Sequence, residues 1–164
     1  MTVNDMDQSA ERVRLVFELG QDSDGWPPAR SERLWAIRVS DDTARLDNIP
    51  FFLRGFSLGD VVRFTVDDED VLLGQEAVEY SDNCTVRVIP AEDGHLAEKR
   101  QAVLDEFARL GVDGEGIAQF GLVALNVPAS AEIAQVKQLL AHGERVARWH
   151  YEEGCVTSAW RAVE

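Results

Sequence analysis

The stretch CTVRVI, residues 84–89, separates two halves of the sequence that differ in their hydrophobic pattern. Its β-branched residues predict a strand, which follows a turn at 81–83 and ends at Pro90. Before this strand, apolar side chains alternate with polar ones over short runs; after it, two longer segments repeat their apolar side chains at helical spacing. The sequence therefore predicts an α+β protein whose halves adjoin at residues 81–84, with the option that they share one sheet.

The first half is expected to consist of short strands. In the run 11–19, Val13, Leu15 and Phe17 stand at every second position, which indicates one buried face. Glycine, proline and aspartate separate this run from similar ones. Strands of this length and spacing predict a small, bent, barrel-like sheet. The expected strands cover residues 11–19, 33–39, 44–53, 61–66 and 71–80.

The second half predicts two helices between strands. Residues 96–110 form the first, with Asp93 as N-cap and Gly111 just past its end; the second lies between Ser130 and Gly143.

Three further strands complete this half. The continuous apolar run 120–127 predicts a central strand covered on both faces. Residues 146–152 and 155–160 are expected to form a terminal hairpin. The βαβαβ order resembles a ferredoxin-like layer, in which two helices cover one sheet.

The expected organisation is a flexible N-terminus (1–10), a β-rich subdomain (11–83) and an α/β ferredoxin-like subdomain (84–164), packed as one unit. The length of 164 residues suits one domain or two small ones. No apolar run approaches the roughly 20 residues that span a bilayer, so no membrane partner is expected. The first residues lack the apolar core of a signal peptide, which makes the cytoplasm the expected location.

The charge of the chain is strongly negative and unevenly placed. The formal net charge is −14, and residues 1–83 contain 18 acidic but only 8 basic side chains. Such a surface repels phosphate backbones and anionic membranes, so nucleic acid is not an expected partner. It attracts a basic protein or peptide, although solubility alone also explains it. Between residues 65 and 82 there is no cation, and the predicted binding residues there are Asp67, Asp68, Glu69, Asp70, Glu76, Glu79 and Asp82.

Four sequence motifs resemble those of a known family. They are Glu32 followed by Leu34-Trp35-Ala36, LDNIPFF (46–52), SLGDVV (57–62) and TVRV (85–88). Together they resemble the bacterial "domain of unknown function 4265" family. The resemblance implies a small soluble bacterial protein and brings no known catalytic residue. The family carries a Ser-Gly-type turn before TVRV; here Asn83 is expected to supply the positive φ of that glycine.

These motifs allow a structural and a catalytic interpretation. Asp47 is expected to cap a bend and Asp60 to close a tight turn, with the neighbouring phenylalanines in the core or lining a pocket. Alternatively, Asp47 and Asp60 form a pair of carboxylates for general acid–base catalysis. Cys84 is the third catalytic candidate, since a dyad of Cys84 or Cys155 with His150 is an alternative to two buried or free thiols.

No metal or cofactor is expected. His95, His142 and His150 show none of the spacings of metal-binding motifs, and the sequence contains no P-loop. Arg87 is a further binding candidate, because it either pairs with a carboxylate or holds an anionic ligand.

Three functions remain open at this point. The first is a non-enzymatic binding or regulatory protein, of inhibitor or immunity type, for a basic protein or peptide. The second is a small enzyme or accessory factor that uses Asp47, Asp60, Arg87 or Cys84 on a small molecule or peptide. The third is a ligand-sensing module whose ferredoxin-like half pairs with a second copy as a homodimer.

Overall fold

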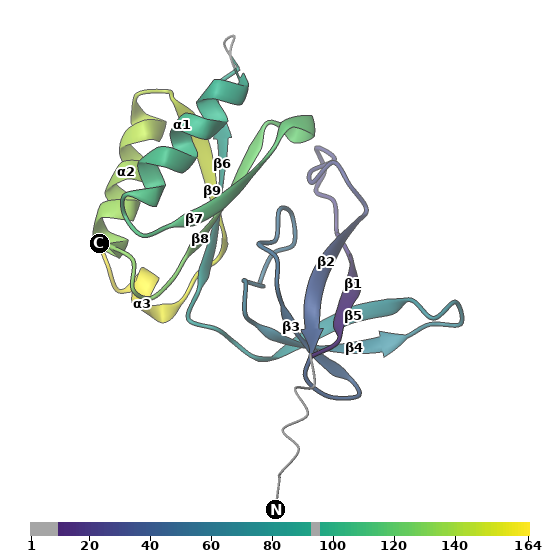
Figure 1. Ribbon diagram of the computed structural model, residues 1–164. Coiled ribbons are helices and arrows are strands. Elements are labelled where there is room, and N and C mark those ends of the chain that lie inside the picture. The colour runs from purple at the N-terminus through teal and green to yellow at the C-terminus, as the bar shows by residue number, and fades with distance from the viewer. Residues whose placement is uncertain (1–9, 93–95) are drawn as a thin grey trace, which may run out of the picture.

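The computed structural model describes residues 10–92 and 96–164, and the first half of the chain is a closed five-stranded barrel (Figure 1). Consecutive strands are antiparallel, and β5 closes the barrel by pairing in parallel with β1. The barrel-like first half is thus as predicted. The strands are β1 Arg12–Glu18, β2 Ser31–Arg38, β3 Thr43–Leu46, β4 Val61–Val66 and β5 Leu72–Glu79.

Apolar side chains at alternate positions of the strands fill the inside of the barrel. On β1, Val13, Leu15 and Phe17 are buried, while Arg12 and Arg14 face outward. Strands β2 to β4 and Leu53, in the loop between β3 and β4, supply the other buried side chains, so the apolar pattern read from the strands is the inner surface of the barrel. The cluster is Val13, Leu15, Phe17, Leu34, Ala36, Ala44, Leu46, Leu53, Val62 and Phe64.

The second half is a four-stranded sheet with helices on one face. The strand order is β7-β8-β6-β9, and all three neighbouring pairs are antiparallel. Helices α1 and α2 cover the face of this sheet that lies away from the barrel (Figure 1). The protein is therefore an α+β fold with mostly antiparallel sheets and few helices. The elements are β6 Cys84–Pro90, α1 Leu96–Ala108, β7 Asp113–Ile117, a 3-10 turn Ala118–Phe120, β8 Leu122–Val127, α2 Ile133–Arg145, β9 Trp149–Cys155 and α3 Ser158–Arg161.

The two halves do not share a sheet, contrary to the option left open by the sequence. The barrel and the four-stranded sheet are separate, and residues 80–83 connect β5 to β6. The expected strand 44–53 ends at Leu46, because the segment after it turns away from the barrel wall. There the side-chain oxygen of Asn48 accepts a hydrogen bond from the backbone amide of Trp35, at 2.7 Å. This side-chain bond replaces the backbone pairing that a longer β3 would make with β2.

One strand was missed. Strand β7 has the sequence DGEGI and pairs with β8 along its length. Its two glycines are untypical of a strand, but a Cβ at Gly114 would lie only 2.7 Å from the side chain of Leu104 and 2.9 Å from that of Leu125. The close packing of α1 on the sheet therefore requires a small residue at this position.

The predicted terminal hairpin is wrong. A single strand, β9, is followed by the short helix α3, whose N-cap Thr157 accepts the amide of Trp160. With this cap, the side chain of Trp160 lies in the core, where its Nε1 donates a hydrogen bond to Glu153 at 2.9 Å.

The predicted ends of α2 are also wrong. Ser130 does not cap the helix, which begins at Ile133 after Glu132. Gly143 does not end the helix but lies inside it. A glycine is needed there, since a Cβ would be 2.1 Å from the ring of Trp149. Gly111 does end α1 as expected, with φ +80°.

Other expectations fall outside the described residues. These are the flexible N-terminus over residues 1–9, and Asp93 and His95 before α1. In the part of the chain that the structure covers, no helix is both long and apolar enough to cross a bilayer.

Candidate functional site

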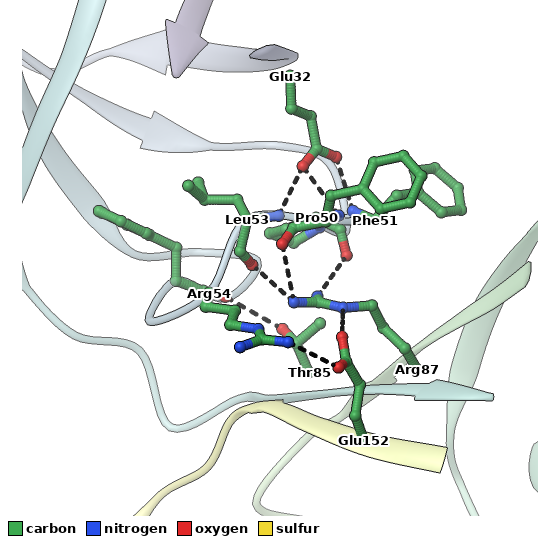
Figure 2. Close-up of polar contacts among 10 residues, drawn as sticks. Glu32, Pro50, Phe51, Leu53, Arg54, Thr85, Arg87 and Glu152 are labelled. Atoms are coloured by element: carbon green, nitrogen blue, oxygen red, sulfur yellow. Dashed lines mark hydrogen bonds and ion pairs between the residues drawn. The ribbon is translucent and has the colours of Figure 1, made fainter. Parts of the chain in front are cut away.

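A loop of the LDNIPFF motif lies between the barrel and the sheet, held by Glu32 from the barrel side. The carboxylate of Glu32, on β2, accepts the backbone amides of residues 51–53 at 2.6, 3.0 and 2.8 Å (Figure 2). Glu32 is only 9% exposed. Three charge-assisted bonds compensate the burial of this carboxylate and fix the path of the loop.

Arg87, on β6, holds the same loop from the sheet side. Its Nη2 donates to the carbonyls of Phe52 and Leu53, both at 3.1 Å, and its Nε donates to Glu152 at 2.8 Å (Figure 2). The guanidinium has no exposed surface, and a Cβ at Gly154 would lie 2.6 Å from it. The predicted ion pair with a carboxylate is therefore present, and the donors of Arg87 are directed at this chain rather than at an external anion.

Aromatic contacts complete this junction. The ring of Phe52 meets that of Phe120 at 5.0 Å and that of Trp26 at 5.8 Å, both edge to face. Phe52 thus connects the loop 20–30 of the barrel with the sheet. The amide of Gly55 also donates to the carbonyl of Gly154 at 3.0 Å. The LDNIPFF motif therefore acts as the joint between the two halves.

Beside this joint lies a pocket with a volume of about 590 Å³. One wall comes from the SLGDVV turn and the connection from β5 to β6, and the other from β9 and α3. Its lining is Gly55, Asp60, Tyr80, Ser81, Asp82, Asn83, Glu153, Gly154, Cys155, Val156, Thr157, Ser158 and Arg161.

Asp60 forms the buried end of the first wall. Its Oδ2 accepts the amide of Ser57 at 2.9 Å, and its Oδ1 accepts the amide and the hydroxyl of Ser81 at 2.7 and 2.9 Å. Burial raises the pKa of Asp60 above its usual value, while the bonds from Ser81 and Ser57 act in the opposite direction. The carboxylate ties the SLGDVV turn to the 80–83 connection and so shapes the pocket.

Asn83 has a different role from the one expected. It is not among the residues with positive φ; instead its side-chain amide donates to the carbonyl of Leu58 at 2.7 Å. Ser81 donates to the same carbonyl, also at 2.7 Å. The connection is thus fixed by side chains where a glycine would act through its backbone.

The two cysteines do not form a disulfide. Cys155 lines the pocket and is partly buried, whereas Cys84 is fully buried and contacts Thr157. Burial raises the pKa of the Cys155 thiol; nearby Asp60 and Cys84 raise it further, and a hydrogen bond from Ser57 lowers it. A thiol with a raised pKa is protonated at neutral pH, so Cys155 is not an activated nucleophile.

Only one of the three predicted catalytic residues lines the pocket. Asp60 is part of the lining, whereas Cys84 is fully buried and Asp47 is exposed on the barrel, and neither belongs to the lining. Arg87 belongs to the joint. Within residues 10–92 and 96–164, no group of three His, Cys, Asp or Glu side chains is placed to hold a metal ion.

The predicted acidic binding residues spread along one hairpin. Four of them form the turn between β4 and β5, at residues 67–70, whereas Asp82 lies at the opposite end, in the pocket lining. Glu76 and Glu79 lie between, on β5, and Glu76 pairs with Arg63. The sequence missed Tyr80, Ser81, Glu153 and Arg161, because nothing in their spacing indicates that β9 and α3 approach the end of β5.

Comparisons with known proteins agree with this fold. The family model described as a domain of unknown function (DUF4265) matches residues 32–151. The chain is similar to a solved structure from Neisseria gonorrhoeae, described as a novel crystal structure of a hypothetical protein. The TM-score is 0.70, with 18% sequence identity over 89% of this chain and 96% of that chain. At this identity the likeness concerns the fold alone. No curated protein matches the chain.

Proposed function

The chain belongs to the DUF4265 family, and from this premise we propose that it is a non-enzymatic binding protein for a basic peptide or a basic segment of a partner protein. The ligand would enter the pocket between β5, β9 and α3 and continue along β5. A protein of this kind would act as a regulator or as an inhibitor or immunity-type protein, by covering its basic partner.

The observation that carries this proposal is the charge of the pocket. Two exposed carboxylates contribute to its lining, from Asp82 and Glu153, with the buried Asp60 behind them, against one basic side chain, Arg161. The volume of about 590 Å³ lies within the usual range of ligand pockets, roughly 300–1,000 Å³. A lysine or arginine side chain is the protein group that such a lining would attract.

Tyr80 adds an aromatic contact at the same place. It is 68% exposed, although large aromatic side chains are usually covered in a folded chain. A cation above a tyrosine ring is attracted by about 0.5–1 kcal/mol at an exposed site. Tyr80 next to Asp82 would thus contribute both a ring and a charge to the recognition of a basic side chain.

Strand β5 offers a track for the rest of a peptide. It pairs with β1 only at Leu72 and Leu73, so in the described structure the edge facing away from β4 is unpaired from residue 74 to Glu79. An extended peptide adds to such an edge through its backbone. Glu79, near the pocket, would then favour basic residues at alternate positions of that peptide.

An enzyme or accessory factor receives less support. Asp47 is not part of the pocket lining, and burial raises the pKa of the Cys155 thiol, so it is not activated. The ligand-sensing alternative would also use the pocket, but for a small molecule.

The finer fold assignment is part of the proposal. The succession β6-α1-β7-β8-α2-β9 with the strand order β7-β8-β6-β9 supports a ferredoxin-like second half, since this is a split βαβ arrangement. The free thiols of Cys84 and Cys155 support a cytoplasmic location.

A direct test is the binding of a fluorescent peptide that alternates lysine or arginine with valine. We expect binding at low salt and weakening at high salt. Asp82→Asn and Tyr80→Ala should each weaken binding by about two- to fivefold, as expected for one exposed charge or ring contact. Asp113→Asn, on exposed β7, changes the net charge as Asp82→Asn does and serves as its control.

Two outcomes would contradict the proposal. The first is no binding of the basic peptide at low salt. The second is equal weakening by Asp82→Asn and Asp113→Asn, which would mean that only the total charge matters.

A further inference from the structure

The outer wall of the barrel carries a basic face on this acidic protein. Arg12 and Arg14 on β1, Arg33 on β2 and Arg45 on β3 are all exposed. The strand register brings them together, because Arg12 pairs with Ile37 on β2, and Ile37 pairs with Arg45 on β3. We call these four arginines the basic face.

The basic face is ordered by an aromatic ring. Arg14 lies opposite Trp35, and the guanidinium groups of Arg12 and Arg14 lie 4.2 and 4.9 Å from the centre of that ring. In the described part of the chain, none of the four arginines forms an ion pair, whereas Arg38, on the same strand as Trp35, pairs with Glu11. Four cations are thus available to an anionic partner, two of them oriented by the ring of Trp35.

A shallow groove borders this face. It has a volume of about 350 Å³ and lies at the seam where β1 meets β5. Val16, Val71 and Leu72 give it an apolar floor, with Arg14 and Arg33 beside them. The groove therefore combines apolar area with positive charge, as the centre and rim of a protein interface do.

A surface of opposite charge adjoins the same groove. The turn between β4 and β5, residues 67–70, consists of four consecutive carboxylates, and Asp70 also lines the groove. We call it the acidic tip. It is held in shape by Asp67, whose Oδ1 accepts the amides of Glu69 and Val71 at 2.8 and 2.9 Å.

We propose that the basic face binds the acidic tip of a second copy of this chain, in a two-fold dimer. The occupant follows from charge complementarity, since the sequence carries four consecutive carboxylates only in this tip. Because the two surfaces adjoin in one copy, a two-fold axis near Arg14 and Asp70 brings both complementary pairs together at once. Such an arrangement closes as a dimer and leaves no unsatisfied end.

Nucleic acid is a less suitable occupant of this face. The net charge of −14 and the acidic tip beside the groove repel phosphates. The ring of Trp35, which would have to stack on a base, is already engaged by Arg12 and Arg14. The dimer is also independent of the proposed peptide site, which uses the pocket end of the hairpin rather than its tip.

The test is analytical ultracentrifugation of the full chain from micromolar to millimolar concentration. At low salt we expect the mass to approach twice that of the monomer, and at about 1 M salt, where screening is nearly complete beyond about 3 Å, the mass of the monomer. A mass that stays monomeric at low salt over the whole range overturns the proposal.

Charge reversal identifies the surfaces. The variant R14E/R33E and the variant D68K/E69K should each be monomeric, and an equimolar mixture of the two should form a mixed dimer. D113K/E115K, on the exposed strand β7, reverses as many charges as D68K/E69K and should dimerise like the wild type. Misfolded variants would not associate, so association in the mixture shows that both variants are folded and that the two surfaces meet. Failure of the mixture to associate overturns the proposal.

A different occupant would also be recognised. If the wild type is monomeric but binds an oligonucleotide or a polyglutamate peptide, and R14E/R33E abolishes this binding, the basic face serves another anion and the dimer is overturned.

Discussion

Arg87 and Glu152 form an ion pair with 2.8 Å between Nε and Oε1, in which the arginine is completely buried while the glutamate side chain keeps 28% of its exposure. The arginine belongs to the sheet, and its remaining donors reach the barrel loop. One guanidinium thus connects the two halves, and its removal is the most direct test of the joint.

Arg87→Leu should lower the free energy of unfolding by roughly 3–5 kcal/mol, because it leaves the carbonyls of Pro50, Phe52 and Leu53 and one oxygen of Glu152 without this donor. Urea denaturation measures this change. Arg54→Leu is the matched control, since Arg54 pairs with the same Glu152 but is 63% exposed; it should cost less than about 1 kcal/mol. Equal costs for the two variants would refute the role assigned to the joint.

Glu32→Gln should destabilise the protein by about 2–3 kcal/mol. The glutamine amide would place a donor against the backbone amides that the carboxylate now accepts from residues 51–53. Glu18→Gln, at an exposed position of β1, should change stability by less than about 0.5 kcal/mol. Chemical denaturation of both variants measures the two changes in stability. A Glu32→Gln variant as stable as the wild type would contradict the role of Glu32 in holding the loop.

The carboxyl of Asp60 should make the protein more stable as the pH falls towards 4. Its pKa is raised in the folded state from the usual 3.8, chiefly by burial, so the folded state binds the proton more tightly than the unfolded state does. This contribution is absent above the folded pKa and grows as the pH falls through it to below 3.8.

Stability measured against pH for the wild type and Asp60→Asn isolates the Asp60 contribution. The advantage of the wild type over the variant should increase from pH 7 to pH 4. A wild-type advantage that shrinks over this range would mean that the pKa of Asp60 is lowered on folding.

Cys155 should react slowly with iodoacetamide in the folded protein. Burial raises its pKa above 9.0, so little thiolate is present at pH 7.5, and the labelling rate should still be rising above pH 9. Mass spectrometry should find one label per chain, which Cys155→Ser removes, since Cys84 is fully buried. A rate that levels off near pH 7 would instead indicate an activated thiol and favour the enzyme alternative.

Gly143→Ala should destabilise the protein by about 1–3 kcal/mol, although alanine is the better helix former by about 1 kcal/mol. The new Cβ would overlap the ring of Trp149, 2.1 Å away. Gly20→Ala is the control, because nothing lies within 4 Å of its Cβ position. Thermal unfolding of both should separate them; a stabilised Gly143→Ala would show that α2 can move away from β9.

The sequence predicts the barrel well because its strands are half buried. Val13, Leu15 and Phe17 carry a strict alternation, and the structure confirms each as buried. Strand β7 has no such pattern, and its Gly114 is required by the packing of Leu104 on the sheet. The need for a glycine at residue 114 comes from contacts with side chains of other elements, so the pattern of apolar residues along β7 does not reveal it.

The candidate site was predictable only in part, for the same reason. Asp60 could be selected from its turn, but its partners Ser57 and Ser81 and its neighbour Cys155 meet only after β5 and β9 are placed. The acidic run between residues 65 and 82 looks continuous in sequence. The hairpin divides it into a tip and a pocket end, because the strand β5 separates them.

The central strands β6 and β8 have an implication for the autonomy of the two halves. Thr85 and Arg87 on β6, and Leu122, Ala124 and Asn126 on β8, are all buried on the face opposite the helices. The barrel half and its loop cover that face. Without residues 11–83, the sheet would expose to water a face that is mostly apolar and contains the guanidinium of Arg87. We therefore expect the two halves to unfold together in one transition, rather than as two modules joined by a linker.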